Sequence, residues 1–312
     1  EMTSSSSIIE GNTIAGNDSI GIYINGRTDL KGNYIGTDRN FNNLGNGSDG
    51  LFIGGRCVVT FPSSLDSANY IGFNKRHGIY SQGNMTACNA SFNYIGVTPQ
   101  GDPMPNGEYG IYMETSRQDQ NIKGNLIGFN GKGGVHYEDY NSIITENLFF
   151  GTNGKAISDR RTSYQLAIPS IIQVKKGNDR ILVEGTTDTF RVSTVELFAT
   201  NGGLQTAHVF LGNTVTDSTG AFSFAIPTEK LSGYGDTICF SATATYEMGG
   251  TSNLSDPFCC ENCLCVIDTT VLPVDTILVG ESFLGITYTE AGFYDDIFEV
   301  LKRPNGCDFV VK

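Results

Sequence analysis

The 312-residue chain contains no tryptophan, only three histidines, and few charged residues, which make up 17% of the sequence. No run of apolar residues approaches the length of a membrane span, so the sequence offers no candidate transmembrane segment. The formal net charge of −13 argues against nucleic acid or an anionic membrane as a partner, because surfaces that bind phosphate are basic. The scarcity of charge, together with 39 glycines, excludes a coiled coil and favours turn-rich β-structure.

The length of the chain allows two or three domains. The chain begins at Glu1 instead of an initiator methionine, and it shows no signal peptide. We therefore expect it to be a mature or excised portion of a longer product.

A short motif that begins with asparagine recurs through the first half of the chain. It reads Asn-Tyr-Ile-Gly three times, with three variants, and its copies begin at Asn12, Asn33, Asn69, Asn93, Asn125 and Asn147. Each copy is followed by a glycine and an aliphatic residue, which begin at Gly21, Gly50, Gly78, Gly110, Gly134 and, with alanine in place of glycine, Ala156. The intervals from each asparagine to the following glycine or alanine are therefore 9, 17, 9, 17, 9 and 9 residues. Such self-similarity, with an eight-residue insertion in two copies, predicts a solenoid.

The pattern inside each unit predicts that the solenoid is built from β-strands. The apolar runs are short and alternate, as in Ile22-Tyr23-Ile24 and Ile111-Tyr112-Met113, and no helical apolar face of ten or more residues occurs. We therefore predict an all-β chain in which residues 1–168 form a parallel β-helix of about six coils. The two insertions, Gly36 to Asp49 and Val97 to Tyr109, are expected to leave the coil on one side.

The residue order of the repeat also resembles that of the right-handed parallel β-helix repeats of large secreted bacterial proteins. In those repeats Asn-x-Ile-Gly-Thr-Asp precedes Gly-Asn-Gly-x-x-Gly-Ile, and residues Asn33 to Asp38 and Gly45 to Leu51 reproduce this order closely. The resemblance covers roughly residues 1–165. It implies a right-handed coil and a secreted, extracellular protein.

One surface feature of the predicted coil is a row of aromatic residues. The second residue after the glycine that follows each asparagine motif should point outward, because side chains alternate along a strand. These residues are Tyr23, Phe52, Tyr80, Tyr112 and His136. The row could stack on sugar rings or dock a neighbouring molecule; alternatively, like residues stack in any β-helix, or the insertions cover them. We interpret the repeated asparagines as turn scaffold, because asparagine side chains bond to nearby backbone groups.

Parallel β-helices include polysaccharide lyases and glycoside hydrolases, so we searched for clustered catalytic carboxylates. Glu114 and Glu138 share one offset in their coils, and Arg27 and Arg56 share another. These two pairs do not converge on one site, and no Ser-His-Asp or Cys-His arrangement emerges. Calcium is conceivable but unsupported, because the acidic residues of the insertions suit turns better: Asp38, Asp49 and Asp102. We expect no cofactor and no metal, and we lean away from an enzyme.

After residue 168 the repeat stops and the strand pattern changes. Alternating runs such as Val195-Glu196-Leu197-Phe198 and Ala242-Thr243-Ala244 are separated by turn residues, which predicts a β-sandwich over residues 169–258. The order resembles the immunoglobulin-like domain that commonly follows such β-helices. That resemblance implies a role in spacing and support.

Eight cysteines indicate an oxidising compartment, and four of them fall in a linker at residues 259–265. The alternative is a zinc or iron–sulfur cluster, but the second Cys/His pair of a zinc site is missing. We therefore expect disulfides, with Cys57 and Cys88 as a candidate pair from neighbouring coils and Cys307 reaching back to the linker. The candidates are Cys57, Cys88, Cys239, Cys259, Cys260, Cys263, Cys265 and Cys307.

Residues 266–312 are expected to form a small β-module. Val279-Gly280-Glu281-Ser282-Phe283 and Tyr288-Thr289-Glu290-Ala291-Gly292 resemble a β-repeat module of surface proteins from gliding bacteria of the Bacteroidota. The resemblance implies a cell-surface location. Asp-Ser/Thr-aliphatic tripeptides that resemble the O-glycosylation motif of that phylum occur at Ser19, Ser67, Thr237 and Thr276.

The sequence thus favours a non-catalytic, extracellular structural or adhesive surface protein. Its expected partners are copies of itself, other surface proteins or a polysaccharide, and head-to-tail association would make it a subunit of a filament or sheath. The alternatives are a carbohydrate-active β-helix enzyme, either a polysaccharide lyase or a glycoside hydrolase, and a carbohydrate-binding module.

Overall fold

In the residues that it describes, the computed structural model is nearly all β, with two short 3-10 helices, η1 (Leu65–Ser67) and η2 (Thr228–Leu231). It describes residues 6–55, 57–83, 87–114, 120–138, 142–151, 153–159, 166–177, 179–188, 191–234, 237–246 and 250–261. Beyond residue 261 it describes the backbone of β27 (Thr269–Thr270), β28 (Ser282–Phe283), β29 (Ile286–Thr287), β30 (Glu299–Lys302) and β31 (Asp308–Val311). In that region β31 pairs with β27 and β30, and β28 pairs with β29. The predicted module there stays a prediction.

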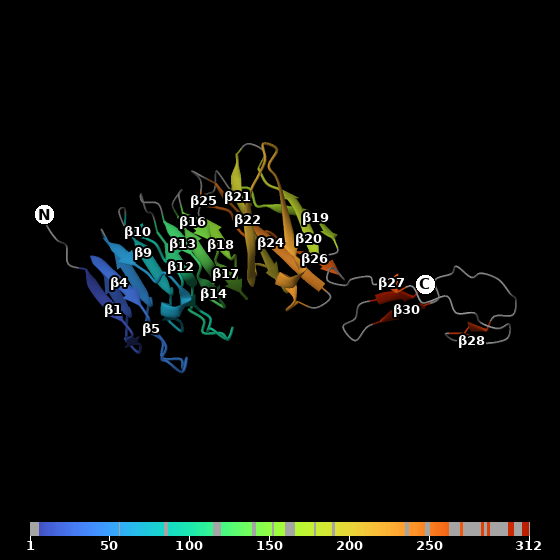
Figure 1. The fold of residues 1–312 in the computed structure, drawn as a ribbon. Helices are drawn as coiled ribbons and strands as arrows, with labels where there is room; N and C mark the ends of the chain where they lie inside the picture. Colours follow the sequence, from blue (N-terminus) through green and yellow to red (C-terminus); the bar gives the residue numbers. More distant parts are fainter. Residues whose placement is uncertain are drawn as a thin grey trace.

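Parallel sheets run the length of the first half of the chain (Figure 1). The first contains β1 (Ser7–Glu10), β4 (Arg27–Lys31), β7 (Val58–Thr60) and β10 (Ala87–Cys88), and β13 (Asn121–Lys123) pairs separately with β16 (Ile143–Thr145). The second contains β2 (Thr13–Ile14), β5 (Tyr34–Ile35), β8 (Tyr70–Ile71), β11 (Tyr94–Ile95), β14 (Leu126–Gly128) and β17 (Leu148–Phe150). The third contains β3 (Ile22–Ile24), β6 (Leu51–Gly54), β9 (Ile79–Gln82), β12 (Tyr109–Met113), β15 (Gly133–Tyr137) and β18 (Ile157–Asp159).

Within each of these sheets, neighbouring strands are parallel and lie three places apart along the chain, as in β5 with β8 and β6 with β9. Three successive strands therefore make one coil, and β1 to β18 make six coils. The prediction of an all-β chain that starts with a parallel β-helix is confirmed. The interior of the coils is filled by aliphatic side chains from the inward positions, among them Ile35, Ile71 and Ile95, none of which is exposed to solvent.

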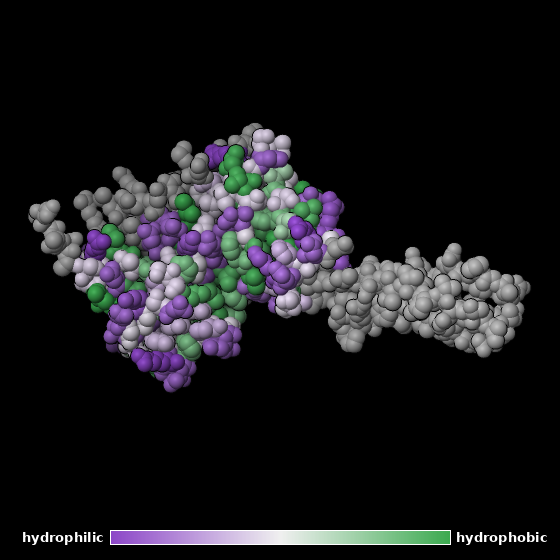
Figure 2. All heavy atoms as spheres, viewed as in Figure 1, coloured by the Kyte–Doolittle hydropathy of each residue, from purple (hydrophilic) through white to green (hydrophobic). Residues whose placement is uncertain are grey.

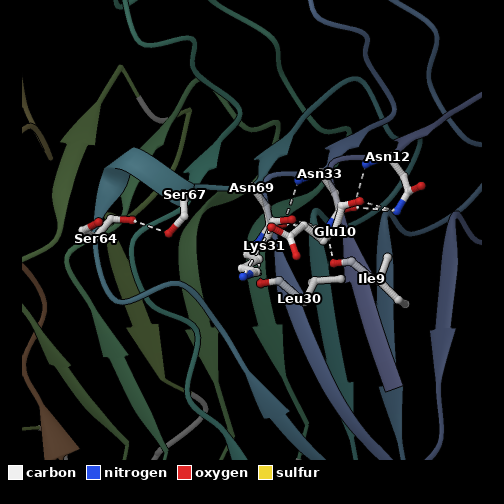
Figure 3. Close-up of polar contacts among 9 residues, drawn as sticks. All are labelled: Ile9, Glu10, Asn12, Leu30, Lys31, Asn33, Ser64, Ser67 and Asn69. Carbon is white, nitrogen blue, oxygen red and sulfur yellow. Dashed lines mark hydrogen bonds and ion pairs between the residues drawn. The ribbon is translucent and has the colours of Figure 1, made fainter. Parts of the chain in front are cut away.

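Asparagines at two corners of the coil stack into ladders. In the first ladder, which begins at Asn12, the Oδ1 atom of each later asparagine accepts a hydrogen bond from the asparagine one coil earlier. The backbone N–H of Asn33 lies 3.1 Å and its Nδ2 3.0 Å from Oδ1 of Asn69 (Figure 3). The predicted scaffold role of these residues is confirmed. A second ladder, which the sequence analysis missed, contains Asn17, Asn46, Asn74, Asn106 and Asn130.

Both insertions leave the coil at the same corner, between the second and the third sheet. The first lies between β5 and β6, and the second lies between β11 and β12. Each is closed at its base by an equivalent backbone hydrogen bond, from Leu44 N–H to Gly36 O and from Met104 N–H to Gly96 O. The insertion after β5 projects from the lower edge of the β-helix as a hydrophilic tip (Figures 1 and 2). The expectation that both leave on one side agrees with these connections.

After the last coil the pairing becomes antiparallel in two sheets. One contains β19 (Ser170–Lys176), β20 (Arg180–Thr186) and β23 (Ala221–Pro227). The other contains β22 (Val209–Val215), β21 (Ser193–Thr200), β24 (Thr237–Tyr246) and β25 (Gly250–Thr251), with β26 (Phe258–Glu261) also paired with β24. Side chains from both sheets, including Val183, Leu197 and Phe240, share one core, so the sheets form a sandwich. Its immunoglobulin-like character stays a prediction.

The sandwich packs directly against the last coil of the β-helix. Strand β21 is buried on both of its faces: Leu197 points into the sandwich core, whereas Phe198 belongs to the core of the β-helix. Ala207 and Leu254 join the same β-helix core. A β-bridge between Phe149 and Ala207, with backbone hydrogen bonds of 2.8 and 2.9 Å, extends the second sheet onto the sandwich. The β-helix and the sandwich therefore share a continuous apolar interior.

The cysteines follow the expectation only in part. A disulfide joins Cys239 to Cys259 across the neighbouring strands β24 and β26, and Cys260 is also disulfide-bonded. The predicted pairing of Cys57 with Cys88 is wrong, because Cys57 is a buried free thiol. The register explains the difference: Cys88 is level with Val59, so it lies two residues further along its strand than Cys57. Cys263, Cys265 and Cys307 lie outside the described residues.

Candidate functional site on the outer face of the third sheet

The third sheet brings the predicted aromatic residues together in one line. The strand register places Tyr23 beside Phe52, Phe52 beside Tyr80, Tyr80 beside Tyr112, and Tyr112 beside His136. Successive ring centroids are 5.2, 5.0, 5.4 and 5.1 Å apart. We call these five residues the aromatic row. The rings of the row therefore contact one another along its whole length.

The rings do not all present the same surface. Tyr23 stacks flat on Phe52, with 7° between the ring planes, and 62% of its surface is exposed to solvent. Tyr80 instead stands nearly perpendicular to Phe52, at 86°, and the guanidinium carbon of Arg76 lies 5.6 Å from its ring centroid. A Cβ atom at Gly54 would lie 2.8 Å from Cε1 of Phe52, so a larger residue there would displace this ring. Tyr23 is thus the solvent-exposed end of the row.

Each aromatic side chain from Tyr80 onward bonds to a polar side chain one coil further along. The Tyr80 hydroxyl donates to Glu114, and the Tyr112 hydroxyl donates to Oε1 of Glu138 at 2.7 Å. His136 Nδ1 lies 2.8 Å from the Ser158 hydroxyl. Burial, followed by the hydrogen bond to Glu114, raises the pKa of the Tyr80 hydroxyl, which therefore stays a donor at neutral pH. The two glutamates that share an offset are thus brought to successive rungs, each held by a phenol.

A charged cluster lies at the corner before the row. His77 is 2% exposed and stacks on Tyr112 at 4.7 Å between ring centroids. Its Nδ1 accepts the backbone N–H of Tyr109 at 3.3 Å, which leaves the proton on Nε2, 3.4 Å from Glu108. Burial lowers the pKa of His77 to about 4, so the ring is neutral at physiological pH. His77 is therefore a packed structural residue with both ring nitrogens engaged.

The charges of this corner are paired. Arg76 forms an ion pair of 3.4 Å with Asp49, and Lys132 forms one of 3.1 Å with Glu108. Asp49 is buried and accepts the backbone N–H of His77 at 3.1 Å; burial is the main cause of its raised pKa. Among the residues that the structure describes, no group of three or more His, Cys, Asp or Glu side chains could hold a metal ion.

The other polar residues named from the sequence are scattered. Asp38 acts as a turn residue: its Oδ1 accepts the backbone N–H groups of Asn40 and Asn42 at 2.9 and 3.0 Å. Asp102 is exposed in its insertion. Arg27 is exposed on β4, and Arg56 lies outside the described residues.

A second set of stacked rings was not recognised in the sequence. Tyr34, Tyr70 and Tyr94 stack on the outer face of the second sheet, with centroids 4.8 and 5.2 Å apart. Phe41, from the first insertion, packs edge-on against Tyr70 at 5.5 Å. The sequence feature that could have predicted this stack is the tyrosine that follows the asparagine in three copies of the motif. Here an insertion does lie on an aromatic surface, one of the two arrangements considered for the other row.

The candidate glycosylation residues differ in accessibility. Ser19 and Thr237 are exposed, whereas Ser67 is half-buried and donates to Ser64 O at 3.4 Å. Thr276 lies outside the described residues. Their modification stays a prediction.

No family model matches the sequence, and no curated protein matches it. The resemblance to secreted proteins of the Bacteroidota therefore stays a prediction. In the described part of the chain, no helix is long and apolar enough to cross a membrane.

Proposed function

We propose that this chain is a non-catalytic structural module of a secreted cell-surface protein, and that its β-helix and sandwich act as one stiff spacer. The observation that carries the proposal is the way the sandwich closes the end of the β-helix. The last coil of a β-helix would otherwise expose unpaired strand edges and an apolar cross-section. A protein that keeps these two parts at a fixed angle can hold an attached partner at a fixed distance from the surface.

Hydrogen bonds from the sandwich occupy the open edge of the last coil. The backbone N–H groups of Ile144, Ala156 and Ile157 donate to the side chains of Thr251, Gln205 and Asn253, over 2.8, 2.9 and 3.2 Å respectively. The buried Tyr137 hydroxyl donates to Thr251 O at 2.6 Å, and Thr251 N–H donates to Ser142 O at 3.1 Å. Side-chain acceptors thus replace the backbone acceptors that a further coil would supply.

The aromatic row also supports a structural role. The phenols of Tyr80 and Tyr112 hold Glu114 and Glu138, and the Tyr80 ring meets the rings of Phe52 and Tyr112 edge-on. Carboxylates that serve as general acid and base must instead be directed at a substrate. We infer that these polar groups mainly bind adjacent coils to one another.

The proposal is tested by calorimetry of the full chain. If the β-helix and the sandwich are one body, residues 6–261 unfold in a single transition whose calorimetric and van't Hoff enthalpies agree. The double variant Gln205→Ala, Asn253→Ala removes two acceptors from the junction and should split or broaden that transition. Asn40→Ala in the exposed first insertion is the matched control. Two well-separated transitions in the unmodified chain would contradict the proposal.

A second candidate function, carbohydrate binding, is favoured by Tyr23. One face of its ring stacks on Phe52, and its large exposure leaves it accessible to a planar or ring-shaped ligand. We propose it as an adhesive contribution to the structural role, with polysaccharide as the partner. Tyr23→Ala should abolish binding on a glycan array, whereas Val58→Ala, which truncates an exposed apolar residue of another sheet, should not.

Self-association is supported by the first coil. Ile8 on β1 is 67% exposed, and Asn12 and Asn17 stand at the ends of the two ladders. We propose that this coil contacts the distal end of another copy, as a head-to-tail contact would require. Sedimentation velocity over a range of concentrations tests this: Ile8→Lys should shift the chain toward monomer, and a concentration-independent monomer would end the proposal.

A further inference from the structure

A buried carboxylate sits at the junction between the β-helix and the sandwich. Glu196 lies on β21 and is 2% exposed. Both of its carboxylate oxygens lie within hydrogen-bonding distance of the backbone N–H of Glu146, at 2.9 and 3.1 Å. Glu146 occupies the corner between β16 and β17 and has a positive φ of 56°. Glu196 therefore connects the outer face of the sandwich to a strained corner of the last coil.

No cation balances this carboxylate directly among the described residues. Lys123, on β13, is directed to the Glu146 side chain, with 3.1 Å between Nζ and Oε1. From the sandwich, the strand register places Thr243 opposite Glu196, and the Thr243 hydroxyl is buried without a hydrogen-bond partner. His208, elsewhere in the junction, stacks on Phe150, and burial lowers its pKa, which keeps it neutral at physiological pH. The charged groups that face Glu196 are thus Glu146 and Lys123, which pair with each other.

Burial without a direct cation disfavours the ionised form of Glu196. It is the main reason why the pKa of this carboxyl is raised to about 7, and the Glu146 carboxylate adds to the effect. When the sandwich is undocked, the side chain is in water and its pKa returns toward its ordinary value of 4.5. Between these two values the docked state binds more protons than the undocked state, so docking weakens as the pH rises.

We propose that this junction is a pH-sensitive latch, in which proton uptake by Glu196 strengthens the docking of the sandwich on the last coil and proton loss weakens it. The proton comes from solvent and resides on one carboxyl oxygen, while the other oxygen continues to accept the Glu146 N–H. The unpartnered Thr243 hydroxyl, on the residue opposite, is an available acceptor for the new O–H. No covalent bond changes.

The latch goes beyond the spacer function, because it depends on the docked geometry and not on what the protein carries. Its consequence would be a junction that is stiff in mildly acidic surroundings and looser above neutral pH. A spacer that fails to bind any surface partner would leave the latch intact, and a pH-independent junction would leave the spacer function intact.

Hydrogen exchange of the full chain tests the latch. After correction for intrinsic exchange, protection of residues 142–151 and 250–255 should fall about tenfold for each pH unit between pH 5.5 and 7 and level off above it. Glu196→Gln keeps a carbonyl acceptor for Glu146 but cannot ionise, so its protection should stay high and nearly constant across this range. The matched control is Glu184→Gln on β20, which removes a surface carboxylate paired with Lys175 and should retain the wild-type pH dependence.

Two results would overturn the proposal: equal protection of the wild type at both ends of the pH range, or a pH dependence that persists in Glu196→Gln. A direct titration of the Glu196 carboxyl carbon by NMR in the unmodified protein provides a second readout that does not depend on the variant folding. A midpoint near 7 supports the latch, and a midpoint below 5 refutes it.

Discussion

Asn69 accepts two hydrogen bonds from Asn33 through one oxygen atom: the backbone N–H and the side-chain amide of Asn33 both donate to its Oδ1. Its own Nδ2 donates onward to Asn93 at 2.9 Å. All three asparagines are fully buried. The ladder therefore satisfies, in a chain that runs along the β-helix axis, polar groups that have no access to water.

This arrangement predicts a large effect for a small change. Asn69→Ala removes the acceptor of the buried Asn33 backbone N–H and the donor to the buried Oδ1 of Asn93, while Nδ2 of Asn33 keeps its bonds to Ile9 O and Lys31 O. It should reduce the free energy of unfolding by about 3–5 kcal/mol. The measurement is chemical denaturation followed by circular dichroism. Asn40→Ala, in the exposed first insertion, should change stability by less than about 0.5 kcal/mol. Similar losses for both variants would contradict the role assigned to the ladder.

The bonds between the aromatic row and the glutamates predict a measurable difference between two tyrosines. Tyr112→Phe removes the donor to Glu138 and should cost about 1–2 kcal/mol, because the carboxylate is left in a mostly buried position. Tyr23→Phe removes a hydroxyl from the exposed end of the row and should be close to neutral. If the two variants are equally stable, the phenol–carboxylate bonds do not bind the coils together.

Packing of the row makes Gly54 sensitive to substitution. An alanine Cβ there would meet the Phe52 ring at 2.8 Å, so Gly54→Ala should displace the ring and cost about 1–3 kcal/mol. Gly233→Ala, where a Cβ would meet no atom within 4 Å, is the matched control. Thermal unfolding of the two variants gives the comparison, and a neutral Gly54→Ala would show that the ring is free to move.

His77 gives the β-helix a pH dependence opposite in sign to that of Glu196. Because its folded pKa of about 4 lies below the ordinary value of 6.5, the unfolded chain binds more protons in this window. The contribution of His77 to stability should therefore be complete above pH 6.5 and fall by about 3 kcal/mol as the pH drops to 4. Comparison of the wild type with His77→Gln between pH 4 and 7.5 isolates this effect. A stability difference that stays constant over that range would contradict it.

The disulfide between Cys239 and Cys259 should stabilise the sandwich. It closes a loop with a sequence separation of 20, and its loss should cost roughly 3 kcal/mol. Cys239→Ser should therefore lower the midpoint of sandwich unfolding and speed proteolysis of residues 237–261. Cys57→Ser, at a cysteine without a disulfide, should leave that region unchanged. A sandwich insensitive to Cys239→Ser would show that strand pairing alone holds β26 in place.

The repeat predicts most of the β-helix because each coil reuses the same local chemistry. An asparagine at a corner, an aliphatic residue inward and an aromatic residue outward recur at fixed intervals, so the register of Tyr112 beside Tyr80 could be anticipated from spacing alone. The pairing of Cys57 with Cys88 failed because counting coils does not give the position within a strand. The second ladder was missed because insertions of different sequence precede Asn46 and Asn106.

The junction could not be predicted from local patterns. Residues such as Glu196 and Thr251 meet the last coil from more than 40 positions away in the sequence, and the residue types of β21 resemble those of any sandwich strand. A buried charge opposite a backbone amide has no local sequence signature. Only the three-dimensional packing of β21 shows that both of its faces are covered.

Hydrogen exchange at the last coil shows most directly whether the sandwich closes the β-helix to form one body. If it does, the amides of Ile144, Ala156 and Ile157, which donate to the sandwich, exchange at pH 6 as slowly as those of the interior coils, such as Tyr94. Exchange of these three amides on a time scale far shorter than that of Tyr94 would show that the sandwich is not docked on the last coil.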